Sequence, residues 1–133
     1  MIKSLLKSKG VQPQRDRIIT YTIRILHEKK HEDIRAVIPD HPMPKKVVRE
    51  STGEGFIPEV TARKDGQYRI FAVETRETLG SEKTGLRWQL FEAYAKQHDA
   101  LFFIVFPTGL VSSIKEKLNE FHVEARLWQA SAD

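Results

Sequence analysis

An uninterrupted apolar run in the C-terminal third of the chain constrains the fold more than any other feature. Residues 101–106 read Leu-Phe-Phe-Ile-Val-Phe, and Pro107-Thr108-Gly109 ends the run. A strand with one face in water alternates apolar and polar side chains, whereas a strand buried on both faces does not. The run therefore predicts a central strand covered on both faces, which favours an α/β protein in which helices cover a sheet.

The rest of the chain alternates between helical and extended patterns. Apolar residues recur at helical spacing within 14–30, although the β-branched stretch 18–23 would also suit a strand. Ser81 predicts the N-cap of a later helix, and Ser113 with Glu116 predicts a capping box for another. The expected helices are 14–30, 82–97 and 113–121, and the expected strands are 34–38, 56–63, 68–75, 101–106 and 123–128.

Size and composition indicate one domain. The chain has 133 residues, of which 40% are hydrophobic and 30% are charged, which suits a single hydrophobic core. Within it we expect a loose N-terminal segment at 1–13 and a long basic loop at 39–55, where prolines and glycines interrupt any regular pattern. No apolar stretch is long enough to cross a membrane and no secretory signal is recognisable, so we expect a cytoplasmic protein.

The absence of cysteine limits the chemistry that a site can use. It excludes disulfides, thiolate zinc sites and cysteine nucleophiles, so a metal ion would be bound by carboxylates, histidines or carbonyl groups. The 22 Lys and Arg residues outnumber the 18 Asp and Glu residues, which gives a net charge of +4. This charge permits nucleic-acid binding without requiring it.

Two acidic residues flank the predicted hairpin at positions that can bring them together. Glu59 lies in the first extended run, Glu74 lies in the second, and Asp65-Gly66 between the runs is a tight-turn signal. A loop of two or four residues places Glu59 opposite Ala72, on the face shared by Glu74 and Arg76, whereas a three-residue loop separates the carboxylates. Diagonal neighbours lie about 7–8 Å apart, so the pair suits either one metal ion or an ion pair with Arg76.

These residues, and the order of elements around them, resemble the PD-(D/E)XK or restriction-endonuclease-like nucleases, and most closely the archaeal Holliday-junction resolvases. The resemblance covers residues 14–106; Pro58-Glu59 is similar to the family's Pro-Asp, and Glu74-Thr75-Arg76 is similar to its (Asp/Glu)-X-Lys. It implies a three-layer α/β/α core with a mixed sheet, extended by a helix and a strand at the C-terminus. It also implies a homodimer that cleaves DNA, including branched DNA, with Mg²⁺ or Mn²⁺.

The resemblance assigns roles to individual residues. Glu59 and Glu74 would bind the metal, which polarises the scissile phosphate while a metal-bound water attacks. Arg76 would stabilise the developing negative charge, and Asp16 lies where the resolvases have a further catalytic acidic residue. The nucleic-acid-binding residues that the resemblance implies are Arg15, Arg17, Lys45, Lys46, Arg49, Ser51, Arg63 and Lys64.

Two departures from the family pattern leave the activity open. Glu59 replaces aspartate, which keeps a hard oxygen ligand. Arg76 replaces lysine, and arginine does not lose its proton under ordinary conditions. The sequence is therefore compatible with an attenuated nuclease, or with an inactive nuclease-like domain that binds nucleic acid or a protein partner. In the second case Arg76 would form ion pairs with both carboxylates.

The motif His27-Glu28-Lys29-Lys30-His31 predicts a competing function. His-Glu-X-X-His is typical of zinc proteases when both histidines lie one turn apart on a helix. Such a site needs a third ligand, for which His41, Glu50 and Glu54 are available. The two lysines at its centre favour a solvent-facing helix instead of a buried zinc site.

Overall fold

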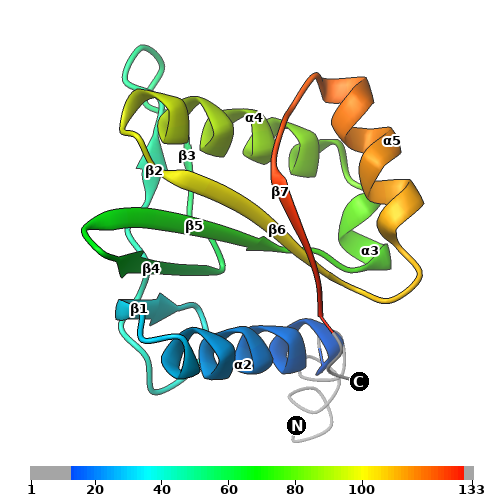
Figure 1. The fold of residues 1–133 in the computed structure, drawn as a ribbon. Helices are drawn as coiled ribbons and strands as arrows, with labels where there is room; N and C mark the ends of the chain where they lie inside the picture. Colours follow the sequence, from blue (N-terminus) through cyan, green and yellow to red (C-terminus); the bar gives the residue numbers. More distant parts are fainter. Residues whose placement is uncertain (1–12, 131–133) are drawn as a thin grey trace, which may run out of the picture.

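The computed structural model describes residues 13–130, which form a five-stranded mixed sheet with helices on both faces (Figure 1). Helix α2 packs on one face, and helices α4 and α5 pack on the other. The predicted α/β class is therefore confirmed. The helices are α2 (Pro13–Glu28), α3 (Arg76–Leu79), α4 (Glu82–Gln97) and α5 (Val111–Phe121), and the strands are β1 (Glu32–Ala36), β2 (Val47–Val48), β3 (Gly55–Phe56), β4 (Val60–Lys64), β5 (Gln67–Val73), β6 (Leu101–Pro107) and β7 (Arg126–Ala130).

The sheet is antiparallel in one half and parallel in the other. Its order is β1-β4-β5-β6-β7, where β1, β4 and β5 are antiparallel neighbours and β5, β6 and β7 are parallel. Asp65 and Gly66 form the two-residue turn between β4 and β5, and both have positive φ, as a type I′ turn requires. Because Val60 pairs with Phe71, the predicted hairpin register, with Glu59 opposite Ala72, is confirmed.

Strand β6 is the buried strand that the apolar run predicts, and it lies in the interior of the sheet between β5 and β7. Phe102, Ile104 and Phe106 pack in the core beneath α4 and α5, and Val105 packs in the core beneath α2. Burying a large apolar side chain stabilises a fold by about 1.5–3 kcal/mol, so this strand contributes to both cores. Phe103 differs from these four because it is only half-buried, on the α2 side of the sheet.

The predicted helices are present, with differences at their ends. Ser81 is the N-cap of α4, as predicted, and its side chain accepts a hydrogen bond from the Lys83 N–H at 3.2 Å. The capping box predicted from Ser113 is wrong, because α5 already begins at Val111 and its N-cap is Leu110, which makes no side-chain cap hydrogen bond. Apolar burial of Leu110 and Ile114 sets this helix start instead of a polar cap.

Two predictions of extended or irregular chain are corrected. The expected loop at 39–55 contains the short strands β2 and β3, which pair with each other in a second, two-stranded sheet. The expected strand through Thr75 ends at Val73, and Thr75 becomes the N-cap of α3. Its backbone N–H donates to Thr78 Oγ1 at 2.9 Å, a capping interaction that favours a helical turn over further strand.

The N-terminal segment predicted to be loose, 1–13, lies outside the described residues except for Pro13, where α2 begins. Within residues 13–130, no helix has both the length and the apolar character needed to cross a membrane.

Candidate functional site

Glu59 and Glu74 lie side by side at one end of the β4–β5 hairpin. Glu59 immediately precedes β4, and its Oε1 accepts a hydrogen bond from the Val73 N–H at 2.8 Å. Glu74 immediately follows β5, where its N–H donates to the Val105 carbonyl at 2.9 Å. Both residues are buried, with 5% of Glu59 and 0% of Glu74 exposed. The hairpin register thus brings the two carboxylates together, as the sequence predicts.

An arginine from α4 connects the two carboxylates. Arg87 Nη2 lies 3.1 Å from Glu74 Oε2, and it lies 3.4 Å and 3.5 Å from the two carboxylate oxygens of Glu59. On the other side, Arg15 Nη2 from α2 lies 3.4 Å from Glu59 Oε2. Two carboxylates and two guanidinium groups therefore form one charge-balanced cluster, built from the hairpin and from a helix on each face of the sheet.

Neutral donors complete the hydrogen bonding of Glu74. Thr78 Oγ1 donates to its Oε1 at 2.6 Å, and Trp88 Nε1 donates to its Oε2 at 2.9 Å. With the bonds from Val73, Arg15 and Arg87, each of the four carboxylate oxygens accepts at least one hydrogen bond. A buried carboxylate is tolerated when it is paired and bonded in this way, so the cluster needs no further group to be satisfied.

Burial dominates the electrostatics of Glu74. Removal from water raises the pKa of its carboxyl above the ordinary value, and the negative charge of Glu59 raises it further. The Arg87 guanidinium opposes this rise in pKa, as do the hydrogen bonds from Thr78 and Trp88. Arg87 is therefore the group that keeps a negative charge at this position acceptable.

Arg76 does not join the ion pairs of the cluster among the described residues, and its role beside a phosphate stays a prediction. It is the first residue of α3 and is exposed, because the chain leaves the strand after Val73. Among the described residues, the ion pairs of Glu59 and Glu74 are formed by Arg15 and Arg87. The cation that pairs with both carboxylates is thus supplied from α4, 13 residues after Glu74.

Sequence reasoning missed Arg87, although a signal for it was present. Thr84, Trp88 and Phe91 share one face of the predicted helix 82–97, and all three are buried. Arg87 follows Thr84 by three residues and precedes Phe91 by four, so it belongs to the same face. A cation on the apolar face of a helix requires a buried acid nearby, and Glu59 and Glu74 were the acids already singled out.

The other residues assigned to catalysis or nucleic-acid binding lie in different places. Asp16 is exposed and pairs with Arg15 at 3.8 Å, so it contacts the cluster only through that arginine. Ser51 is exposed in the turn between β2 and β3. Lys64 lies at the far end of the hairpin, where its Nζ donates to the Lys29 carbonyl at 2.8 Å. Arg17, Lys46 and Arg49 are exposed.

Two of the predicted basic residues line one groove. Lys45 and Arg63 border a polar hollow of about 430 Å³ at the turn end of the hairpin, together with the rings of Tyr68, Tyr94 and His98 and the carboxylates of Asp65 and Asp99. The Arg63 guanidinium lies 5.1 Å from the centre of the Tyr68 ring, and the Tyr94 and His98 rings stack with centroids 4.1 Å apart. The β4–β5 turn and the start of α2 lie at opposite ends of the molecule (Figure 1), so this groove is separate from the carboxylates.

The zinc-protease motif does not form its helical geometry. Helix α2 ends at Glu28, so His27 is helical while His31 lies beyond the helix, where its Nε2 contacts Arg69 Nη1 at 3.3 Å. His41 contacts the Pro39 carbonyl instead of the motif. Within residues 13–130, no group of three His, Asp or Glu side chains is placed to hold a metal ion.

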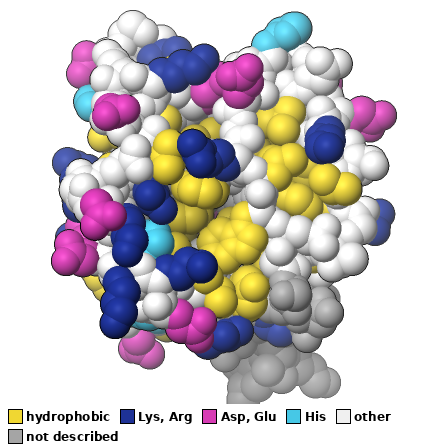
Figure 2. Space-filling model, viewed as in Figure 1, with side chains coloured by type: hydrophobic (Ala, Val, Ile, Leu, Met, Phe, Trp, Pro, Cys, Tyr) yellow, Lys and Arg dark blue, Asp and Glu magenta, His cyan; other side chains and the backbone are white. Residues whose placement is uncertain are grey.

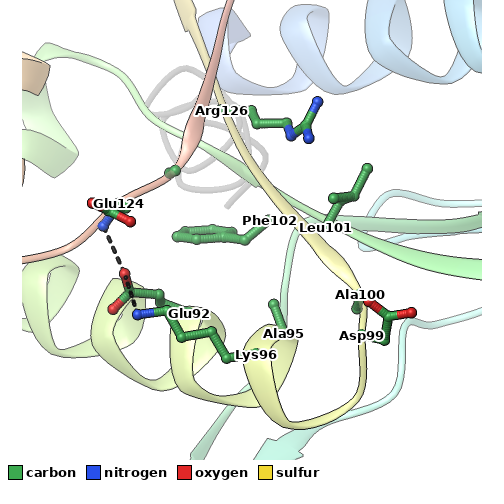
Figure 3. A pocket seen from close by; sticks show the side chains of 10 residues that line it. Glu92, Ala95, Lys96, Asp99, Ala100, Leu101, Phe102, Glu124 and Arg126 are labelled. Atoms are coloured by element: carbon green, nitrogen blue, oxygen red, sulfur yellow. Dashed lines mark hydrogen bonds and ion pairs between the residues drawn. The ribbon is translucent and has the colours of Figure 1, made fainter.

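A further hollow of about 340 Å³ lies where the end of α4 meets the starts of β6 and β7 (Figure 3). Its central acid, Glu92, accepts a hydrogen bond from the Glu124 N–H at 2.8 Å and pairs with Lys96 Nζ at 3.5 Å. These contacts tie the segment before β7 to α4. Glu92 and Lys96 are therefore explained by contacts within the fold.

No protein-family model, curated protein or solved structure matches this chain. Its function has to be inferred from the geometry of the described residues and from their chemistry.

Proposed function

We propose that this chain is a nuclease-like domain of the PD-(D/E)XK type that binds nucleic acid without cleaving it. The observation that carries the proposal is the position of Arg87, whose Nη2 lies 3.1–3.5 Å from the oxygens of both carboxylates. In a metal-dependent nuclease, a divalent cation occupies the place between such carboxylates. A guanidinium supplies positive charge there, but it is neither a Lewis acid nor a carrier of an activated water.

The arrangement around the carboxylates supports the family assignment. Pro58-Glu59 directly precedes β4, and Glu74 directly follows β5, so the two motifs meet at one end of a hairpin. The hairpin lies in a mixed sheet, and helices cover both faces of that sheet. Helices on both faces of a mixed sheet agree with the three-layer arrangement that the resemblance implies, and agreement of this kind supports a relationship but not an activity.

The groove at the turn end of the hairpin supports nucleic-acid binding. Lys45 and Arg63 place two cations beside two tyrosines and a histidine, and the carboxylates of Asp65 and Asp99 line the same groove. Lysine and arginine side chains bind phosphate, while aromatic rings stack on unpaired bases. The net charge of +4 favours the approach of a polyanion. Single-stranded or distorted DNA fits this combination of cations and rings better than a uniform duplex does.

A second candidate function is metal-dependent DNA cleavage. One nitrogen of Arg87 reaches both carboxylates, so a single cation at that place is within reach of both. If Arg87 were displaced, Glu59 and Glu74 would hold Mg²⁺ or Mn²⁺, which would supply Lewis-acid activation of a phosphate and of water. The position of Arg87 argues against this state, because its guanidinium would have to leave both carboxylates before a metal ion could occupy the same place.

Cleavage and binding assays on the full chain separate the two functions. We expect no cleavage of linear or four-way branched DNA with Mg²⁺ or Mn²⁺, and no heat of metal binding in calorimetry. We expect fluorescence anisotropy to detect binding to single-stranded DNA that weakens as salt rises. The double variant Lys45→Gln/Arg63→Gln should lower the slope of log affinity against log salt by about 2.

The controls identify which proposal fails. Lys115→Gln removes an exposed charge from α5, outside the groove, so it should bind DNA like the unchanged chain. Metal-dependent cleavage that disappears in Glu74→Gln would replace the proposal by the second candidate. DNA binding without salt dependence, or binding that the double variant leaves unchanged, would remove the nucleic-acid role of the groove.

A further inference from the structure

A hollow on the α2 side of the sheet has a composition that the carboxylate cluster does not explain. It has a volume of about 460 Å³ and lies between the C-terminal half of α2 and strands β5, β6 and β7. Four of its ten lining residues are aromatic, namely Tyr21, Phe71, Phe103 and Trp128. Figure 2 shows hydrophobic side chains at the centre of this face, with Lys and Arg side chains and a histidine beside them.

The hollow exists because one helix covers the α2 face. Five strands about 4.8 Å apart span roughly 19 Å, whereas a helix with its side chains is about 10 Å wide. Helix α2 contacts all five strands, and the other two long helices pack on the opposite face. Beside the C-terminal half of α2, Phe103 of β6 and Trp128 of β7 remain half-buried.

The aromatic side chains form a continuous wall. The Phe71 and Phe103 rings stack with centroids 4.9 Å apart and planes 16° from parallel. Trp128 meets Phe71 edge-on at 6.0 Å, and Tyr21 contacts Trp128 at 6.2 Å. Each ring is held by at least one other ring, so the wall is preorganised to receive a flat apolar group.

The polar residues that line the hollow are basic. They are Lys29, His31 and Arg69, and no Asp or Glu is among the lining residues. Arg69 Nη1 lies 3.3 Å from His31 Nε2. Because a guanidinium only donates hydrogen bonds, Nε2 must accept, which leaves the proton of the neutral imidazole on Nδ1.

Two buried donors of this group lack a well-formed hydrogen bond. Within the described residues, Arg69 Nε is buried without a partner, and His31 Nδ1 makes no hydrogen bond of good geometry, although the Leu26 and Lys29 carbonyls lie close enough to raise the pKa of the imidazole. Buried polar groups are nearly always bonded, so an unpaired pair in one place calls for a ligand or an ordered water. Both atoms are donors, and an anionic oxygen is the acceptor that suits them together with the charge of Lys29.

We propose that this hollow binds a small aromatic anion, of the aryl carboxylate class. Its ring would lie against Phe103 and Trp128, and its carboxylate would lie toward Arg69 and Lys29. The volume falls within the range of about 300–1,000 Å³ that is usual for small-molecule sites. Residues 1–12 suit the hollow poorly, because that segment contains three lysines and no acid.

The site is independent of the proposed nuclease-like function. Helix α2 contacts the carboxylate cluster through Arg15 near its start and borders the hollow with Tyr21 and Leu26 nearer its end. Failure of DNA binding therefore leaves this proposal intact, and the reverse also holds.

Calorimetric titration of the full chain with two matched probes tests the proposal. The probes are 2-naphthoate and its neutral amide, 2-naphthamide, which share a ring system and differ in charge. We expect the naphthoate to bind about tenfold or more tightly than the amide, which is the effect of a charge-assisted hydrogen bond. Arg69→Gln should reduce naphthoate binding to the level of the amide, while amide binding itself is unchanged and reports an intact hollow.

Two further variants keep the test decisive. Lys29→Gln changes an exposed residue in the turn after α2 and should weaken naphthoate binding about threefold, a Coulombic loss at the surface. Arg63→Gln is the matched control for Arg69→Gln, because it removes an arginine from the same β4–β5 hairpin. Arg63 borders the other groove, so naphthoate binding should not change. Equal affinity for both probes, or naphthoate binding that Arg69→Gln leaves unchanged, would overturn the proposal. Naphthoate affinity that falls as a dimer forms in sedimentation would assign the hollow to a second copy of the chain instead.

Discussion

Helix α2 links two polar clusters of opposite character. Near its start, Arg15 joins a cluster in which two carboxylates face two guanidinium groups and every carboxylate oxygen accepts a hydrogen bond. Beyond its end, His31 and Arg69 face each other without an acid, and each retains a buried N–H donor that makes no well-formed hydrogen bond within residues 13–130. One cluster is complete, and the other lacks an acceptor.

The comparison shows when a charged cluster is evidence for a bound ligand and when it is not. A complete cluster is explained by the fold alone, because paired and bonded charges are what burial requires. An incomplete cluster is not explained in this way, since unpaired buried donors cost free energy that no protein contact returns. The sequence motifs indicate Glu59 and Glu74 as a ligand site, whereas the missing hydrogen bonds indicate His31 and Arg69.

Breaking the complete cluster should give the largest effect. Arg87→Met leaves Glu74 buried without its cation, and removal of one partner from a buried ion pair typically costs about 3–5 kcal/mol. We expect a loss of that size in the free energy of unfolding, measured by urea denaturation at pH 7. Adding Glu74→Gln to the same chain should restore much of the stability, because the uncompensated charge is then absent.

The matched control for this prediction is Arg17→Met on α2. Arg17 is exposed, so the same substitution should change the free energy of unfolding by about 0.5 kcal/mol or less. A similar small change in Arg87→Met would show that the carboxylates do not depend on Arg87. The ion pairs of Arg87 would then contribute little to the free energy of unfolding.

Local signals predicted the parts of the fold that depend on neighbouring residues. Asp65-Gly66 determines the hairpin register through its positive φ angles, and Ser81 marks the start of α4 through a side-chain cap. The apolar run 101–106 identified the central strand because burial on both faces removes alternation. The same local reasoning wrongly placed Arg76 on the strand face of Glu74. The Thr75–Thr78 cap starts a helical turn there, so the alternation of side chains along a strand does not apply to Arg76.

Partners that are distant in the sequence explain what could not be predicted. Arg87 meets Glu59 across 28 residues, and the contact depends on how α4 lies over the sheet. The same holds for Phe103, which the apolar run assigns to the core and which the single covering helix leaves half-buried. Coverage of a sheet face is a property of the whole arrangement and has no signature within one segment.

The pH dependence of stability should show the burial of Glu74 as a smaller effect. Its folded pKa is raised above the ordinary value of 4.5, so the folded state binds this proton more tightly than the unfolded state does. The free energy of unfolding should therefore fall as the pH rises from the ordinary pKa through the folded pKa. Arg87, Thr78 and Trp88 oppose the rise in pKa, which keeps this effect below that of Arg87→Met.

Glu74→Gln isolates this contribution because glutamine does not titrate. Urea midpoints of the unchanged chain and of Glu74→Gln are measured from pH 4 to pH 8. As the pH rises, the midpoint of the unchanged chain should fall relative to that of Glu74→Gln. A difference that stays constant over this range would mean that Glu74 does not titrate differently in the folded and unfolded states.

The smallest expected effect is a change in the pKa of His31, in the incomplete cluster. It is measured by titration and not as a loss of stability. Burial lowers the pKa of His31 below 6.5, and the positive charges of Arg69 and Lys64 lower it further. Arg69→Gln should raise this pKa only part of the way, because burial is the larger cause and remains. Titration of the imidazole signals by NMR measures the shift, with Arg63→Gln as the control that should leave it unchanged.

The same titration tests whether the cluster of His31 and Arg69 binds an anion or only carries positive charge. A bound anion favours the protonated imidazole, so saturating 2-naphthoate should raise the pKa of His31, whereas 2-naphthamide should not. In Arg69→Gln the naphthoate should lose most of this influence, because the anion is no longer held beside the histidine. A His31 pKa that responds to neither probe would place the anion elsewhere, and the difference between the two ends of α2 would then be one of charge alone.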